Sequence, residues 1–192
     1  MYLIGYTFFG AGYIAYMTFM IAHVRNAGAG AAAQCAFWTC IGVGAIVQPW
    51  VWGSAMAKAA SGRLTAMLLA ITAFGALIPA LAGGPLVLAI SAAVFGNAFF
   101  AVVSSATAFA RLNYPPSTWT SSIAIVTLAF SIGQMLGPIA TGAITDAFGN
   151  LSFALIVSAA MLVAGVVACM IHTITPRDET PRTEPLRHGR RA

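Results

Sequence analysis

Polar side chains capable of hydrogen bonding form a row inside an apolar stretch that begins near Trp119. The row consists of Thr127, Ser131, Gln134, Thr141 and Thr145. Steps of three, four or seven residues place all five on one face of a helix. Such a face avoids lipid and is expected to contact protein or a water-filled cavity. The side chains either join helices by hydrogen bonds or form a cavity wall, and the row as a whole favours the wall.

The stretch from Ser131 to Asp146 also carries features that affect how the helix packs and bends. Gly133 and Gly137 form a G-x-x-x-G pair, which lets a second helix approach closely. Pro138 removes a backbone donor inside the span, so the helix is expected to bend there. We therefore interpret Gly133, Gly137 and Pro138 as a conformational pivot.

Groups that perform acid–base, metal or covalent chemistry are scarce in the apolar stretches. Asp146 is the only acidic residue near any of them, and it lies at the end of one, which argues against a proton relay in this chain. Cys35, Cys40 and Cys169 show no C-x-x-C spacing, so we expect neither a metal site nor a cofactor. The spans contain no H-E-x-x-H, G-x-S-x-G or acidic pair, and an enzyme is not expected.

The composition places these residues in a membrane. Hydrophobic residues make up 60% of the 192 positions and charged residues 7%, and the mean hydropathy is +0.89. No charged residue occurs from Asn26 to Ala57 or from Leu64 to Ala110, and a membrane-spanning helix needs about 20 apolar residues. Six spans are predicted, at about Tyr2–Val24, Ala33–Gly53, Leu64–Ala82, Pro85–Ala110, Trp119–Ala147 and Leu151–His172.

The Lys and Arg residues predict how the spans are oriented. Of nine such residues, eight lie on the side that holds both chain ends, and only Arg25 lies on the other. This bias predicts that both termini are cytoplasmic. Residues 173–192, rich in Pro, Arg, Glu and Thr, are predicted to form a disordered basic tail. The first span alone would prefer the opposite orientation, because Arg25 follows it and no basic residue precedes it, and an upstream segment is expected to resolve this conflict.

The two halves of the chain resemble each other. The first and fourth spans share a motif of aromatic and small residues, written Phe9-Gly10-Ala-Gly-Tyr13 and Phe95-Gly96-Asn-Ala-Phe99. The second and fifth spans share glycine, proline and glycine at identical spacing, at Gly44, Pro49 and Gly53 and at Gly133, Pro138 and Gly142. Because each copy holds three spans, residues 1–84 and 85–172 are predicted to be inverted repeats. Inverted repeats are a transporter architecture, with binding near the midplane between the copies.

Several stretches together resemble the C-terminal half, helices seven to twelve, of the major facilitator superfamily, and most closely its YbfB/YjiJ-like branch of bacterial carriers. The matching residues are Gly5-Tyr6, Phe9-Gly10-x-Gly12-Tyr13-Ile14, Thr18-Phe19, Trp38, Pro49, Trp52-Gly53, Gly133-Gln134-x-x-Gly137-Pro138, Gly142 and Asp146. The similarity covers about Tyr2 to His172. It implies an all-α membrane protein whose six helices form half of a major facilitator fold.

The resemblance also implies a function and a site. A carrier of this superfamily is a secondary transporter of small solutes that works by alternating access, in the bacterial inner membrane. The residues that would line its central cavity are Tyr13, Tyr16, Thr18, Asn97 and Gln134. A complete member has twelve helices, so a partner is expected, either a missing N-terminal half of six helices or a second copy. No nucleic-acid partner is expected, because the basic residues follow the membrane topology.

A second interpretation stays open beside the first. The chain is either half of a facilitator-type carrier, as a fragment or a truncated product, or a self-standing six-helix protein. In the second case it would pair with itself or with another half to form a pore or a carrier. The sequence names neither the substrate nor the coupling ion.

Overall fold

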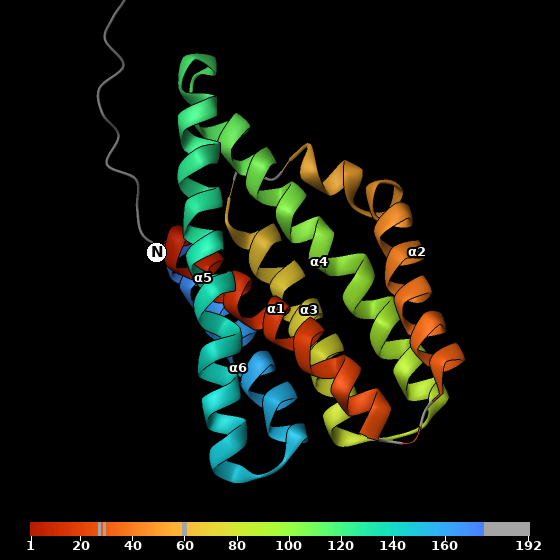
Figure 1. Ribbon diagram of the computed structural model, residues 1–192. Coiled ribbons are helices and arrows are strands. Elements are labelled where there is room, and N and C mark those ends of the chain that lie inside the picture. The colour runs from red at the N-terminus through yellow and green to blue at the C-terminus, as the bar shows by residue number, and fades with distance from the viewer. Residues whose placement is uncertain (27, 29, 59–60, 175–192) are drawn as a thin grey trace, which may run out of the picture.

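The computed structural model describes residues 1–26, 28, 30–58 and 61–174, and these form an all-helical bundle (Figure 1). The described residues contain six helices that are long and apolar enough to cross a membrane. They are α1 (Tyr2–Asn26), α2 (Ala31–Met56), α3 (Arg63–Leu81), α4 (Pro85–Asn113), α5 (Trp119–Phe148) and α6 (Leu151–Ile174). A short 3₁₀ turn, Pro116–Thr118, leads into α5.

The helix boundaries confirm the six predicted spans to within three residues at either end. Uncharged apolar stretches become helices in a membrane because a helix satisfies its own backbone groups. Glycines with positive φ lie at two helix boundaries: Gly149, with φ 64°, follows the end of α5, and Gly84, with φ 109°, precedes Pro85 at the start of α4. The predicted tail, 173–192, lies outside the described residues from 175 onward.

The helices pack in two layers. Helices α5, α1, α4 and α2 lie toward the viewer in Figure 1, and α3 and α6 lie behind them. The most extensive contacts pair α1 with α5 and α6, α4 with α2 and α3, and α3 with α6. This set of pairs is unchanged when α1, α2 and α3 are exchanged with α4, α5 and α6. The same exchange relates the two sequence copies that were predicted to be inverted repeats.

The closest backbone contacts follow the same exchange. A Cβ atom built on Gly133 would lie 2.9 Å from the backbone N of Ala11, and one built on Gly44 would lie 2.7 Å from the backbone N of Asn97. The repeat motifs relate Gly44 to Gly133 and Ala11 to Asn97. Glycine therefore occupies both crossings because the facing backbone leaves no room for a side chain.

Aromatic side chains fill the space between α1 and α4, whose backbones are farther apart. Three stacked pairs join the two helices: Tyr2–Phe109, Tyr16–Phe95 and Tyr13–Phe99. The Tyr13 and Phe99 rings are 5.6 Å apart at an interplanar angle of 11°. These two residues occupy equivalent positions of the repeat motif, so the axis that would relate the copies passes near this pair.

Candidate functional site

Helix α5 carries two different exposed surfaces. Most of its large exposed hydrophobic residues recur at steps of three or four, at Ile125, Leu128, Ile132, Leu136 and Ile139, and Met135 is exposed beside them. Thr127, Ser131 and Gln134 recur at the same steps and are exposed or half-buried. At about 100° per residue, the centres of the two sets lie roughly 120–130° apart around the helix, so they form two different surfaces. The apolar set suits lipid, whereas the polar set needs water or protein beside it.

The predicted polar row does not have one environment along its length. Thr141 and Thr145 are buried, and the Thr145 hydroxyl donates a hydrogen bond to the Thr141 carbonyl. Thr127 and Ser131 are exposed and donate to the carbonyls of Ile123 and Thr127 in the previous turn. The part of the row at Thr141 and Thr145 therefore belongs to the packed bundle, and the part at Thr127 and Ser131 remains open in the isolated chain.

Gln134 and Tyr13 are brought together across 121 residues of sequence. The Gln134 Nε2 atom donates a hydrogen bond to the Tyr13 hydroxyl. The Tyr13 ring is half-buried and stacks on Phe99 and on Phe130, with centroid distances of 5.6 and 5.4 Å. Among the described residues, the Tyr13 hydroxyl proton, the second Gln134 N–H and Gln134 Oε1 have no hydrogen-bond partner, so this pair keeps two donors and one acceptor atom unused.

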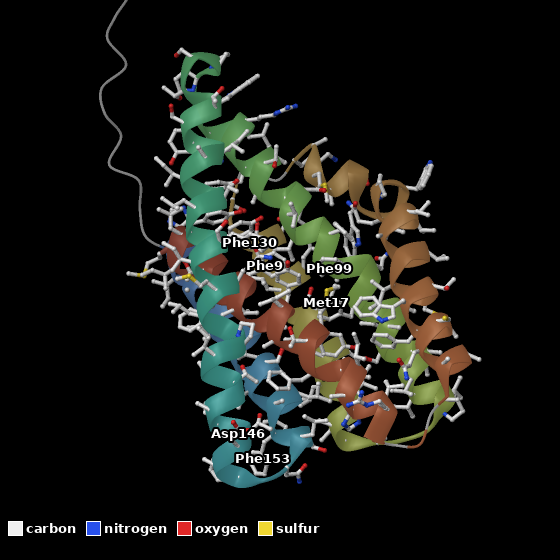
Figure 2. All side chains as sticks on the ribbon, viewed as in Figure 1. Phe9, Met17, Phe99, Phe130, Asp146 and Phe153 are labelled. Atoms are coloured by element: carbon white, nitrogen blue, oxygen red, sulfur yellow. The ribbon has the colours of Figure 1, made fainter. Side chains whose placement is uncertain are left out.

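Figure 2 shows Phe9, Phe99 and Phe130 together near the middle of the bundle, where α1, α4 and α5 meet, with Met17 beside them. Asp146 lies far from this group, at the end of α5 near Phe153 of α6. The surroundings of the Tyr13–Gln134 pair are thus aromatic and lack an acidic neighbour among the described residues of α1, α4 and α5.

Asn97, another predicted cavity residue, is engaged between α2 and α4. Trp52 Nε1 donates a 2.8 Å hydrogen bond to Asn97 Oδ1, and Asn97 Nδ2 donates a 3.4 Å bond to the Gly44 carbonyl. Bonds between membrane helices contribute about 0.6 kcal/mol each on average. Asn97 also lines a cavity of about 340 Å³, which Val43 and Val47 border with exposed side chains. These contacts give Asn97 a role in joining two helices.

The remaining two predicted cavity residues have their own hydrogen bonds. Tyr16 is fully buried, and its hydroxyl lies 2.7 Å from Ser91 Oγ, which in turn donates to the Gly75 carbonyl. This chain of bonds links α1, α4 and α3 inside the core. Thr18 is exposed and donates to the Ile14 carbonyl of its own helix. The structure thus brings together only Tyr13 and Gln134 of the five.

Two cavities flank the face of α4 that adjoins this pair. One, of about 40 Å³, lies between α1, α4 and α5 and is lined by residues that include Tyr6, Val103 and Thr127. The other, of about 260 Å³, lies between α2 and α4 and is lined by residues that include Gln48 and Val103. No charged side chain lines either cavity. We call the surface that carries Tyr13, Gln134, Thr127, Ser131, Val103 and Phe100 the open face.

Gln48 is the polar residue that sequence reasoning missed. It is a buried amide in a helix without charged residues, and it immediately precedes Pro49. An amide next to a proline in an uncharged span is visible in the sequence, but the glycine–proline stretch of the fifth span was the more distinctive pattern.

Comparison with known proteins places the chain in a family. No curated protein and no solved structure matches it. Residues 1–170 match the model of the family described as Uncharacterised MFS-type transporter YbfB, where MFS denotes the major facilitator superfamily. The match extends over α1 to α5 and most of α6, which together form the membrane bundle. The chain therefore belongs to the YbfB-like family of MFS-type transporters.

Proposed function

We propose that the chain forms one half of a secondary carrier that moves a small solute by alternating access. In this proposal the open face is one wall of the solute cavity. The opposing wall comes from a second six-helix half, either an N-terminal half or another copy of this chain. Tyr13 and Gln134 contact the solute, and neither acts as a catalytic group.

The observation that carries this proposal is that α5 exposes two different surfaces, one polar and one hydrophobic. If the exposed side of α5 contacted only lipid, it would be hydrophobic throughout. Instead, Thr127, Ser131 and Gln134 lie on a different surface from the exposed hydrophobic residues. Helices α5 and α2, at the two edges of the open face, are also the least buried of the six helices. Only 11% of the most apolar stretch of α5 and 17% of that of α2 are buried, against 56% for α1. A second half placed on the open face would cover the polar surface and leave the hydrophobic surface to lipid.

The family and the glycine crossings support alternating access in particular. An alternating-access carrier needs helices that change their mutual angle, and contacts between backbones without intervening side chains permit such movement. Gly133 and Gly137 of α5 both face the backbone of α1 at Ala11. We propose that these glycines, with Pro138, form the pivot about which α5 moves.

Orientation is testable with single cysteines at the two ends of α5. Asn150 and Ser117 are both exposed, and the charge bias puts Asn150 outside the cell and Ser117 inside. In a variant without native cysteines, Asn150→Cys should react with an impermeant thiol reagent in intact cells. Ser117→Cys should react only after the cells are opened. Reaction of Ser117→Cys in intact cells would contradict the proposed cytoplasmic termini.

The need for a second half is testable by measuring mass and flux on the same preparation. Isolated, the open face exposes hydrogen-bonding groups, and such groups are costly in lipid. Reconstituted protein should show saturable solute flux only in fractions whose mass includes a second six-helix half. A strictly monomeric species with saturable flux would contradict the proposal and favour a self-contained six-helix carrier.

A further inference from the structure

The cavity between α2 and α4 contains polar groups that the packing of the bundle does not use. It has a volume of about 260 Å³. Its lining consists of Ala45, Ile46 and Gln48 from α2 and Phe100, Val103 and Ser104 from α4. Two of the six residues are polar and none is charged.

Gln48 is the first of these polar residues. Its side chain is only 5% exposed, yet the one contact made by its amide is from Nε2 to the Met56 sulfur at 4.0 Å. A thioether is a weak acceptor. No described residue donates a hydrogen bond to Gln48 Oε1. Gln48 Oε1 is not among the buried oxygen atoms without a partner in the described residues, so this unpaired atom is accessible at the cavity surface and can accept a hydrogen bond from a group placed there.

Ser104 is the second. It is half-buried, and its hydroxyl makes no hydrogen bond to any described residue. Other hydroxyls on these helices, such as those of Thr39 on α2 and Thr107 on α4, donate to the preceding turn of their own helix. The Ser104 hydroxyl and the Gln48 amide each combine a donor with an acceptor. The Phe100 ring, 44% exposed, supplies an apolar wall beside them.

The cavity adjoins the open face. Val103 lines it and also lines the smaller cavity that contains Thr127 of α5. A solute held against Tyr13 and Gln134 on one side of α4 could therefore extend toward Gln48 on the other. At about 260 Å³, this cavity is smaller than a complete site for a drug-sized ligand, which occupies about 300–1,000 Å³, and it would hold part of a solute.

We propose that Gln48 and Ser104 form an uncharged subsite for an amide- or hydroxyl-bearing group of the transported solute. This assignment rests on the proposed function. The two side chains match a neutral group that donates and accepts, whereas an ion would enter without a counter-charge. Desolvation of an unpaired ion is far more costly than that of a neutral polar group, so the subsite selects uncharged groups.

The test uses three planar probes of nearly identical shape: benzamide, the benzoate anion and the benzamidinium cation. Binding to the full chain in lipid nanodiscs is measured by ligand-observed NMR. Benzamide should bind more than about tenfold more tightly than either ion, because neither ion finds a counter-charge. Gln48→Met should weaken benzamide binding by about tenfold, as loss of a hydrogen bond predicts. Gln34→Met, the same change in α2 outside this cavity, should leave binding unchanged.

Ser104→Ala provides a second variant that does not depend on the folding of Gln48→Met, and it should also weaken benzamide binding. Absence of benzamide binding, equal binding of the three probes, or no effect of either variant would overturn the subsite. The transport proposal is tested separately, by water accessibility along α5. If benzamide does not bind but cysteine reactivity along α5 is as predicted, only the subsite is contradicted. If cysteine reactivity along α5 is not as predicted, the carrier proposal itself is contradicted.

Discussion

Replacing Gly133 by alanine should destabilise the bundle by about 1–3 kcal/mol or more, as overpacking does. A Cβ atom at this position would collide with the carbonyl oxygen of Thr7 and lie 2.9 Å from the backbone N of Ala11. Both obstacles are backbone atoms of α1, so no side chain can rotate away to make room. Helices α1 and α5 would have to separate, and the Tyr13–Gln134 hydrogen bond, which spans the same interface, would be strained or lost.

The matched control is Gly142→Ala in the same helix. The nearest atom to a Cβ there is Phe19 Cζ at 3.7 Å, an ordinary contact distance. Thermal unfolding in one detergent should therefore show a lower midpoint for Gly133→Ala and little change for Gly142→Ala. Equal midpoints would show that the α1–α5 crossing is looser than the structure indicates. The pivot assigned to Gly133, Gly137 and Pro138 would then lose its structural support.

The six spans followed from the sequence because membrane insertion depends on local composition. Long uncharged apolar stretches, broken by glycine and proline, determined the helices almost completely. The glycine pair at Gly133 and Gly137 likewise predicted a close crossing, and the structure identifies α1 as the partner. Which helix packs against a given helix depends on the whole fold, so the sequence of one helix does not identify its partner.

The site was less predictable for the same reason. Asn97 was expected at a solute cavity, but its orientation toward Trp52 depends on how α2 lies against α4. Tyr16 was also expected there, and it is buried against Ser91 of α4. Gln134 and Tyr13 were proposed separately, on different spans, and only the packing of α5 on α1 makes them a pair.

Water accessibility along α5 should differ sharply between neighbouring residues. Ser131 and Ile132 are adjacent, and both are exposed in the isolated chain. Their depths in the membrane differ by only about 1.5 Å. The proposal puts Ser131 in the water-filled cavity and Ile132 in lipid. A thiol reacts as the thiolate, and a thiolate does not form in hydrocarbon, because burial of an unpaired charge is very costly.

The most direct measurement is therefore the reaction of Ser131→Cys and Ile132→Cys with a charged methanethiosulfonate reagent. Native cysteines are removed, and open membrane fragments expose both sides, so that either orientation of the cavity can react. Assembled with its second half, the protein should react at least about tenfold faster at Ser131→Cys than at Ile132→Cys. Equal rates at the two positions, or faster reaction at Ile132→Cys, would contradict the assignment of the open face as a cavity wall.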